Sequence, residues 1–207
     1  MGPIARRTMI LAAAASAALA LAACGGAKDG AASAEGDMSM GRADAPVTVV
    51  EYASVTCSHC AAWNEEVFPA FKAKYIDTGQ VRYVFREFPT APAQVAAAGF
   101  LVARCAGDDK YFQVVDAIMR GQRAIFEGDA RGVLLRTAQS AGMTEEQFNA
   151  CVTDEKALQA LNKRVEAGVK AGVQSTPSFV VNGKMYEGAQ PLAALDAAIA
   201  EAKKTAS

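Results

Sequence analysis

Two cysteines separated by two residues, Cys57 and Cys60, constrain the fold of this chain more than any other feature. The β-branched run at 46–52 that precedes them predicts a short buried strand. Apolar side chains recur after them at three- and four-residue spacing as far as Tyr75, which predicts a helix. A second β-branched run at 81–85 predicts another strand. The segment is therefore expected to form a β-α-β unit, with the cysteine pair at the junction between strand and helix.

The sequence after this unit is expected to be helical over about 92–172. Strand character returns at 178–181, Asn182-Gly183 is a strong hairpin-turn signal, and 184–187 completes the hairpin. An apolar stripe over 191–203 predicts a closing helix. This α/β order of elements resembles that of a thioredoxin fold with an α-helical insertion domain. The expected boundaries are 44–91 and 173–207 for the thioredoxin-fold domain and 92–172 for the insertion.

The cysteine pair is expected to be redox-active. Unpaired N–H groups and the helix dipole at a helix N-terminus favour an anion, so a thiolate at Cys57 has a lowered pKa. We therefore expect Cys57 to be the attacking sulfur and Cys60 to be the buried resolving sulfur. His59 is the only histidine of the chain. A partly positive imidazole beside Cys57 stabilises the thiolate further and makes the disulfide more oxidising.

The cysteine pair has two other interpretations. The pair is also half of a zinc site, but zinc requires four ligands, and the sequence contains neither a second C-x-x-C nor another histidine. The pair also fits an inert structural disulfide, although a two-residue spacing at a helix start strains such a bond. We expect no metal site and no cofactor other than the Cys57–Cys60 disulfide itself.

Thr176 and Pro177 directly precede the predicted strand at 178–181. Proline is tolerated as the first residue of a strand, so a plain strand start explains the pair equally well. In a thioredoxin fold this position carries a cis-proline that faces the C-x-x-C. A cis bond there turns the preceding backbone outward, where a substrate peptide pairs with it like an added strand.

Glu51 lies six residues before Cys57, within an apolar strand. Burial of a carboxylate is costly, so this group is expected to be protonated or hydrogen-bonded. One interpretation makes Glu51 the proton acceptor for Cys60 during thiol–disulfide exchange. The other places it on an edge strand, where it reaches solvent.

Cys105 and Cys151 both fall in the predicted helical block. In an oxidising compartment they are expected to form a structural disulfide that takes no part in turnover. Two separately buried thiols are the alternative.

The N-terminus predicts export. Arg6 and Arg7 precede an apolar run that is too short to span a bilayer. The sequence Leu21-Ala22-Ala23-Cys24 resembles a bacterial lipobox, whose cysteine becomes lipidated. An ordinary signal peptide is the alternative, and the arginine pair also faintly resembles a twin-arginine signal. We expect a lipoprotein signal peptide at 1–23, lipidation at Cys24 and a flexible tether at 24–43.

The charge balance excludes one class of partner. The chain has 21 Lys plus Arg and 22 Asp plus Glu, which gives a net charge of −1. Binding to nucleic acid requires a basic face that neutralises phosphates. No nucleic-acid partner is therefore expected.

Taken together, these residues resemble the DsbA-like thiol–disulfide oxidoreductases of bacterial cell envelopes. The resemblance covers about 44–200 and is carried by the Cys57-Ser58-His59-Cys60 motif, the later Thr176-Pro177 and the helical insertion between them. It implies that the protein oxidises the thiols of exported, unfolded or partly folded proteins and is reoxidised by a membrane partner of the DsbB type. It also implies a location on the periplasmic side of the envelope, here with a lipid anchor.

The motif departs from the best-studied members of the family, which carry Pro-His where this chain has Ser58-His59. The residue before the cis-proline, Thr176, is also common in the isomerases DsbC and DsbG. The direction of electron flow therefore stays open between an oxidase and an isomerase or client-specific reductase. From other classes come a non-catalytic envelope lipoprotein that binds peptides and a copper- or zinc-handling protein.

Overall fold

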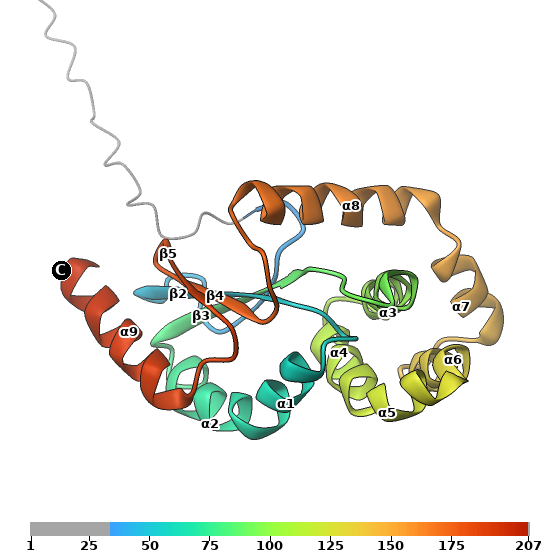
Figure 1. Ribbon diagram of the computed structural model, residues 1–207, viewed down its shortest axis with the longest axis horizontal. Helices are drawn as coiled ribbons and strands as arrows, with labels where there is room; N and C mark the ends of the chain where they lie inside the picture. The colour runs from blue at the N-terminus through green and yellow to red at the C-terminus, as the bar shows by residue number, and fades with distance from the viewer. Residues whose placement is uncertain (1–33, 207) are drawn as a thin grey trace, which may run out of the picture.

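The computed structural model describes residues 34–206, whose centre is a five-stranded sheet in the order β1-β3-β2-β4-β5 (Figure 1). Strands β2 and β3 run parallel, and the other neighbouring strands run antiparallel. The bounds are β1 Met38–Met40, β2 Val47–Ala53, β3 Val81–Glu87, β4 Ser178–Val181 and β5 Lys184–Glu187.

The helices fall into two groups, and the prediction of a helical block inserted into an α/β fold is confirmed (Figure 1). Those outside the insertion are α1 Ser58–Glu66, α2 Phe68–Phe71, the π-helical turn η1 Lys72–Ile76 and α9 Leu192–Ala206. The insertion contains α3 Ala93–Cys105, α4 Tyr111–Arg120, α5 Gln122–Ala124, the π-helical turn η2 Ile125–Asp129, α6 Ala130–Ser140, α7 Glu145–Val152 and α8 Glu155–Lys170.

Strand β2 directs alternate side chains to opposite faces of the sheet. Val49 and Ala53 belong to the large core that also contains the buried side chains of α1, α4 and α9. Val50 and Tyr52 belong to a second, smaller cluster on the other face. Because Glu51 alternates with Val50 and Tyr52, its carboxyl group points into the large core beneath α1, and it is only 2% exposed.

The predicted tether at 24–43 is wrong for the part that the structure describes. Met38–Met40 forms the edge strand β1, paired antiparallel with β3, and Met38 is buried. Asp37 accepts two hydrogen bonds from Arg86, at 2.9 Å each. The composition of this segment is that of a linker. The strand is not predicted because it has only three residues, and its pairing with β3 stabilises it rather than a sequence pattern of its own. The signal peptide at 1–23, Cys24 and the rest of the tether lie outside the described residues.

Cys105 at the end of α3 and Cys151 in α7 form a disulfide, with an S–S distance of 2.06 Å and 46 residues of sequence separation. It joins the first helix of the insertion to the fifth of its α-helices. The pair lies in the insertion, whereas Cys57 and Cys60 are free thiols outside it.

Replacement of both Cys105 and Cys151 by alanine is expected to lower the free energy of unfolding by about 4 kcal/mol. The crosslink restricts the unfolded chain, and a loop of this length is worth roughly that amount. Urea denaturation of the double variant and of the oxidised wild type measures the difference. Equal stability of the two proteins would show that the bond contributes nothing net.

Candidate active site

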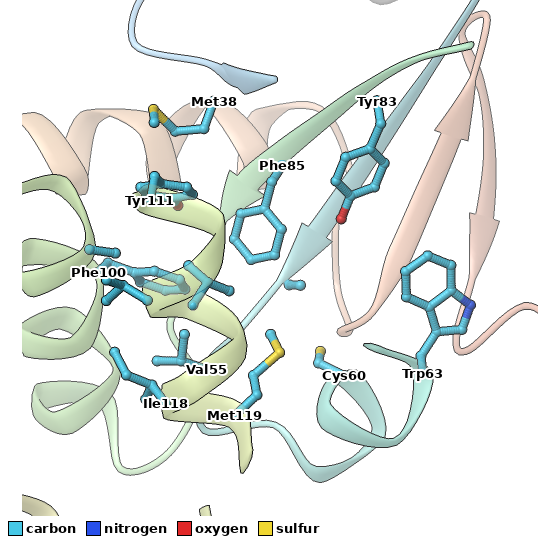
Figure 2. Close-up of a cluster of buried hydrophobic side chains, with 14 of the residues drawn as sticks. Met38, Val55, Cys60, Trp63, Tyr83, Phe85, Phe100, Tyr111, Ile118 and Met119 are labelled. Atoms are coloured by element: carbon cyan, nitrogen blue, oxygen red, sulfur yellow. The ribbon is translucent and has the colours of Figure 1, made fainter. Parts of the chain in front are cut away.

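Cys57 and Cys60 occupy different environments within the first turn of α1. Cys57 is the N-cap residue of this helix and is partly exposed. Cys60 is fully buried in the large core, beside Trp63 (Figure 2). Neither is in a disulfide, and the Cys57 Sγ lies 3.3 Å from the backbone oxygen of Thr176, to which it donates a hydrogen bond in its protonated form. An incoming sulfur therefore has access to Cys57 and not to Cys60.

The two thiols also differ in acidity. The pKa of Cys57 is lowered to about 5, chiefly by the hydrogen bond from the Cys60 thiol, with further contributions from the side chain of Thr176 and from the backbone N–H groups of Cys60 and His59. Burial acts on Cys57 in the opposite direction but is outweighed. Burial is also the main cause that raises the pKa of Cys60 far above its usual range. At neutral pH, Cys57 is therefore a thiolate and Cys60 a thiol.

Alkylation of the reduced protein by iodoacetamide is expected to modify Cys57 with a midpoint near pH 5, because only the thiolate reacts. An unperturbed cysteine has a pKa of about 8.5. Mass spectrometry of the alkylated peptide, against free glutathione as the reference thiol, gives both profiles. A Cys57 midpoint that coincides with the glutathione profile would contradict the stabilised thiolate.

His59 is exposed, between the two cysteines. Its backbone N–H stabilises the Cys57 thiolate and so helps to lower the pKa of Cys57. The role predicted for its imidazole stays a prediction.

Glu51 and Tyr83 form a buried polar pair in the core beneath the cysteines. The Tyr83 hydroxyl donates to Glu51 Oε2, and both residues are at most 3% exposed. Burial raises the pKa of Glu51 to about 8, while the hydrogen bond from Tyr83 partly opposes this rise. The charge of Glu51 in turn raises the pKa of Cys60. Figure 2 shows the Tyr83 ring extending from β3 into the part of the core that contains Cys60.

The Thr176–Pro177 peptide bond is cis, as the sequence predicts. Pro177 is buried and begins the approach to β4, and Thr176 is partly exposed. The backbone oxygen of Thr176 lies against the Cys57 sulfur, so residues separated by 119 positions meet at one site.

Two polar residues that stabilise the loop carrying Cys57 are not predicted from the sequence. Gln122 of α5 is 7% exposed, and its side-chain amide donates to the backbone oxygens of Val55 at 2.8 Å and Cys57 at 3.0 Å. Ser54 Oγ accepts from the backbone N–H of Thr90 at 3.0 Å and so links the loop before α1 to the segment after β3. No local signal marks these polar residues, because their partners are distant in sequence.

Within residues 34–206, no group of three or more His, Cys, Asp or Glu side chains is placed to share a metal ion. In the same part of the chain, no helix is both long and apolar enough to cross a membrane.

Comparison with known proteins places this site in a family. A family model described as thioredoxin matches residues 33–201. A Rickettsia bellii chain, provisionally named a protein-disulfide oxidoreductase, is 37% identical over 175 residues, which cover 82% of this chain and 67% of that relative. A Rickettsia typhi relative with the same provisional name is 36% identical over 154 residues, or 73% of this chain and 56% of the relative. The chain thus spans between about half and two thirds of the length of these curated relatives.

Solved structures agree. The crystal structure of Wolbachia pipientis alpha-DsbA1 matches with a TM-score of 0.77 and 25% identity, over 84% of this chain and 94% of that one. The fold and the paired thiols define a thiol–disulfide oxidoreductase of the thioredoxin superfamily. Within that superfamily, the chain belongs to the DsbA-like family.

Proposed function

We propose that the protein is a cell-envelope enzyme that introduces disulfides into exported proteins through a Cys57–Cys60 disulfide. The observation that carries this proposal is the stabilised thiolate of Cys57, whose pKa is about 5. A thiolate that is stable at neutral pH stabilises the reduced enzyme, and a stabilised reduced form makes the corresponding disulfide a stronger oxidant.

In the proposed reaction, a substrate thiolate attacks the Cys57 sulfur of the Cys57–Cys60 disulfide. The enzyme's S–S bond breaks, a mixed disulfide forms at Cys57, and Cys60 leaves with the electron pair. The buried carboxyl of Glu51, whose pKa is raised to about 8, supplies the proton that Cys60 takes up. During reoxidation, the same group accepts that proton.

A second substrate thiolate then attacks the substrate sulfur of the mixed disulfide and releases Cys57 as a thiolate. The substrate loses two electrons and two protons overall, and the enzyme gains the two electrons. Cys57 is a good leaving group because its thiolate is stabilised. A partner must remove the two electrons before the next cycle.

The backbone at Thr176 and the cis-Pro177 are proposed to hold the substrate peptide as an added strand beside Cys57. Three features support this arrangement: the partial exposure of Thr176, its contact with the Cys57 sulfur and the cis bond.

The setting of the reaction is proposed from the sequence. A signal peptide at 1–23 and a lipid on Cys24 would hold the enzyme on the periplasmic side of the envelope, where disulfides persist. A DsbB-type membrane protein is the proposed electron acceptor.

The test is the reduction potential of Cys57–Cys60, measured in a glutathione redox buffer with a Cys24→Ser variant. A value near that of DsbA, about −120 mV, is expected for a dithiol oxidase. A value near that of thioredoxin, about −270 mV, would overturn the oxidase assignment and favour a reductase or isomerase.

A further inference from the structure

A cavity of about 550 Å³ lies apart from the cysteine site, between α8, the end of β3 and the chain before β1. Neither Cys57 nor Cys60 lines it, and neither Thr176 nor Pro177 does. Its volume falls in the range typical of small-molecule sites, about 300–1,000 Å³. The reaction proposed above makes no use of it.

The interior of the cavity carries more positive than negative charge. The Glu87 side chain is fully buried and accepts hydrogen bonds from two guanidinium groups, those of Arg104 at 2.5 Å and Arg164 at 2.7 Å. One carboxylate shared by two guanidinium groups gives this cluster of lining side chains a net charge of +1. Arg86 also lines the cavity, but its charge is matched by the bidentate contact with Asp37.

The rim adds to this excess. Lys156 and Lys163 of α8 are exposed and line the cavity, opposed there only by Glu35 among its lining residues. The lining thus has five basic and three acidic side chains, a formal charge of +2.

One donor of Arg164, a residue that lines the cavity, lacks an acceptor. Arg164 Nη2 is buried and has no hydrogen-bond partner among the described residues. Buried polar groups almost always have a partner, so an orphaned one requires an explanation. Guanidinium groups bind oxyanions through fixed, paired N–H donors.

From these observations we propose that the cavity binds a phosphate group, held by Arg164 and by the two rim lysines. A dianionic phosphate balances the formal charge of +2, and its oxygens supply the acceptor that Arg164 Nη2 lacks. The cavity is larger than a bare phosphate ion, so the group belongs to a larger molecule, either a soluble phosphate ester or a phospholipid.

A phospholipid headgroup is within reach of the cavity if Cys24 is lipidated as proposed. Ala34, which lines the cavity, is ten residues from Cys24, and ten residues span at most about 35 Å. The headgroup layer would then lie close enough for contact, so the test has to distinguish the two sources.

Thermal unfolding of the purified full chain in sodium phosphate, at ionic strength matched with sodium chloride, tests the proposal. We expect a saturable rise in the unfolding temperature with phosphate that chloride does not reproduce. The double variant Lys156→Gln, Lys163→Gln is expected to lower the affinity for phosphate about tenfold. Arg164→Lys, which keeps the charge but removes the orphaned donor, is expected to lower it by about the same factor. The matched control, Lys170→Gln with Lys204→Gln, changes the net charge equally at exposed positions outside the cavity and should leave phosphate affinity unchanged.

Sedimentation with phosphatidylcholine vesicles, with and without phosphatidylglycerol, then identifies the source. Binding to the anionic vesicles that the rim variant loses indicates a phospholipid headgroup, and phosphate binding without vesicle binding indicates a soluble phosphate compound. A phosphate effect that the control variant loses as fully as the rim variant does, or no saturable effect on either probe, would overturn the proposal.

Discussion

Replacement of Cys57 by alanine is expected to reduce the oxidation of a dithiol peptide to the uncatalysed rate. Replacement of Cys60 is expected to do something different. The Cys60→Ala variant keeps the thiolate that reacts but lacks the thiol that attacks Cys57 from within the enzyme, so a mixed disulfide with a peptide that has a single cysteine should persist. The difference follows from exposure, because Cys57 is accessible and Cys60 is fully buried.

Non-reducing mass spectrometry after incubation with the disulfide-linked dimer of a single-cysteine peptide measures the adduct; one peptide thiol leaves as the other binds Cys57. One peptide per Cys60→Ala molecule is expected, and none on Cys57→Ala. The control is the Cys105→Ala, Cys151→Ala protein, which loses both cysteines of the other pair but should keep its turnover. An adduct on Cys57→Ala would show that Cys60 is reachable, contrary to its position in the core. A protein that binds peptides without catalysis would bind equally well in all three variants.

The parts of the fold that the sequence predicts well are those set by local chemistry. Asn182 and Gly183 adopt positive φ angles of 42° and 89°, which a tight two-residue hairpin turn requires, so the turn and both flanking strands are found where the pattern puts them. Cys57 is at a helix start because a β-branched run ends just before it and a helical pattern begins just after it.

The features that the sequence does not predict depend on contacts between distant segments. Strand β1 forms only because β3 offers it an edge, and its own three residues have no clear strand pattern. Gln122 reaches the backbone oxygen of Cys57 across 65 positions of sequence. Tyr83 is one of two aromatic residues in β3, and only the pairing of β2 with β3 brings its hydroxyl to Glu51. The presence of a buried carboxyl was predictable, but its partner was not.

Stability is expected to fall with rising pH because of Glu51, and a Glu51→Gln variant should not show this loss. The pKa of Glu51 is raised from 4.5 to about 8 in the folded protein, mainly by burial. Between these two values the folded state holds a proton that the unfolded state has released. The stabilisation is therefore complete below pH 4.5 and is lost as the pH rises towards 8.

The magnitude follows from the same shift. Each pKa unit is worth about 1.4 kcal/mol, so the free energy of unfolding of the wild type should fall relative to Glu51→Gln by up to about 5 kcal/mol across this range. Urea denaturation of both reduced proteins at several pH values measures the difference, and the comparison cancels the groups that titrate alike in both. If the free energies of unfolding of the two proteins change in parallel with pH, Glu51 is not held in its protonated form by burial.

Tyr83→Phe provides the matching test of the pair. Loss of the phenol removes a hydrogen bond to the ionised carboxyl, so the pKa of Glu51 should rise further and the window of stability loss should extend above pH 8. If Glu51 also exchanges a proton with Cys60, the pH profile of mixed-disulfide resolution by Cys60 should move upward in the same variant. If the Tyr83 hydroxyl has only a structural role, Tyr83→Phe should lower the free energy of unfolding equally at every pH and leave the pH profile of resolution by Cys60 unchanged. The two measurements therefore separate a packing role of Tyr83 from an effect on the pKa of Glu51.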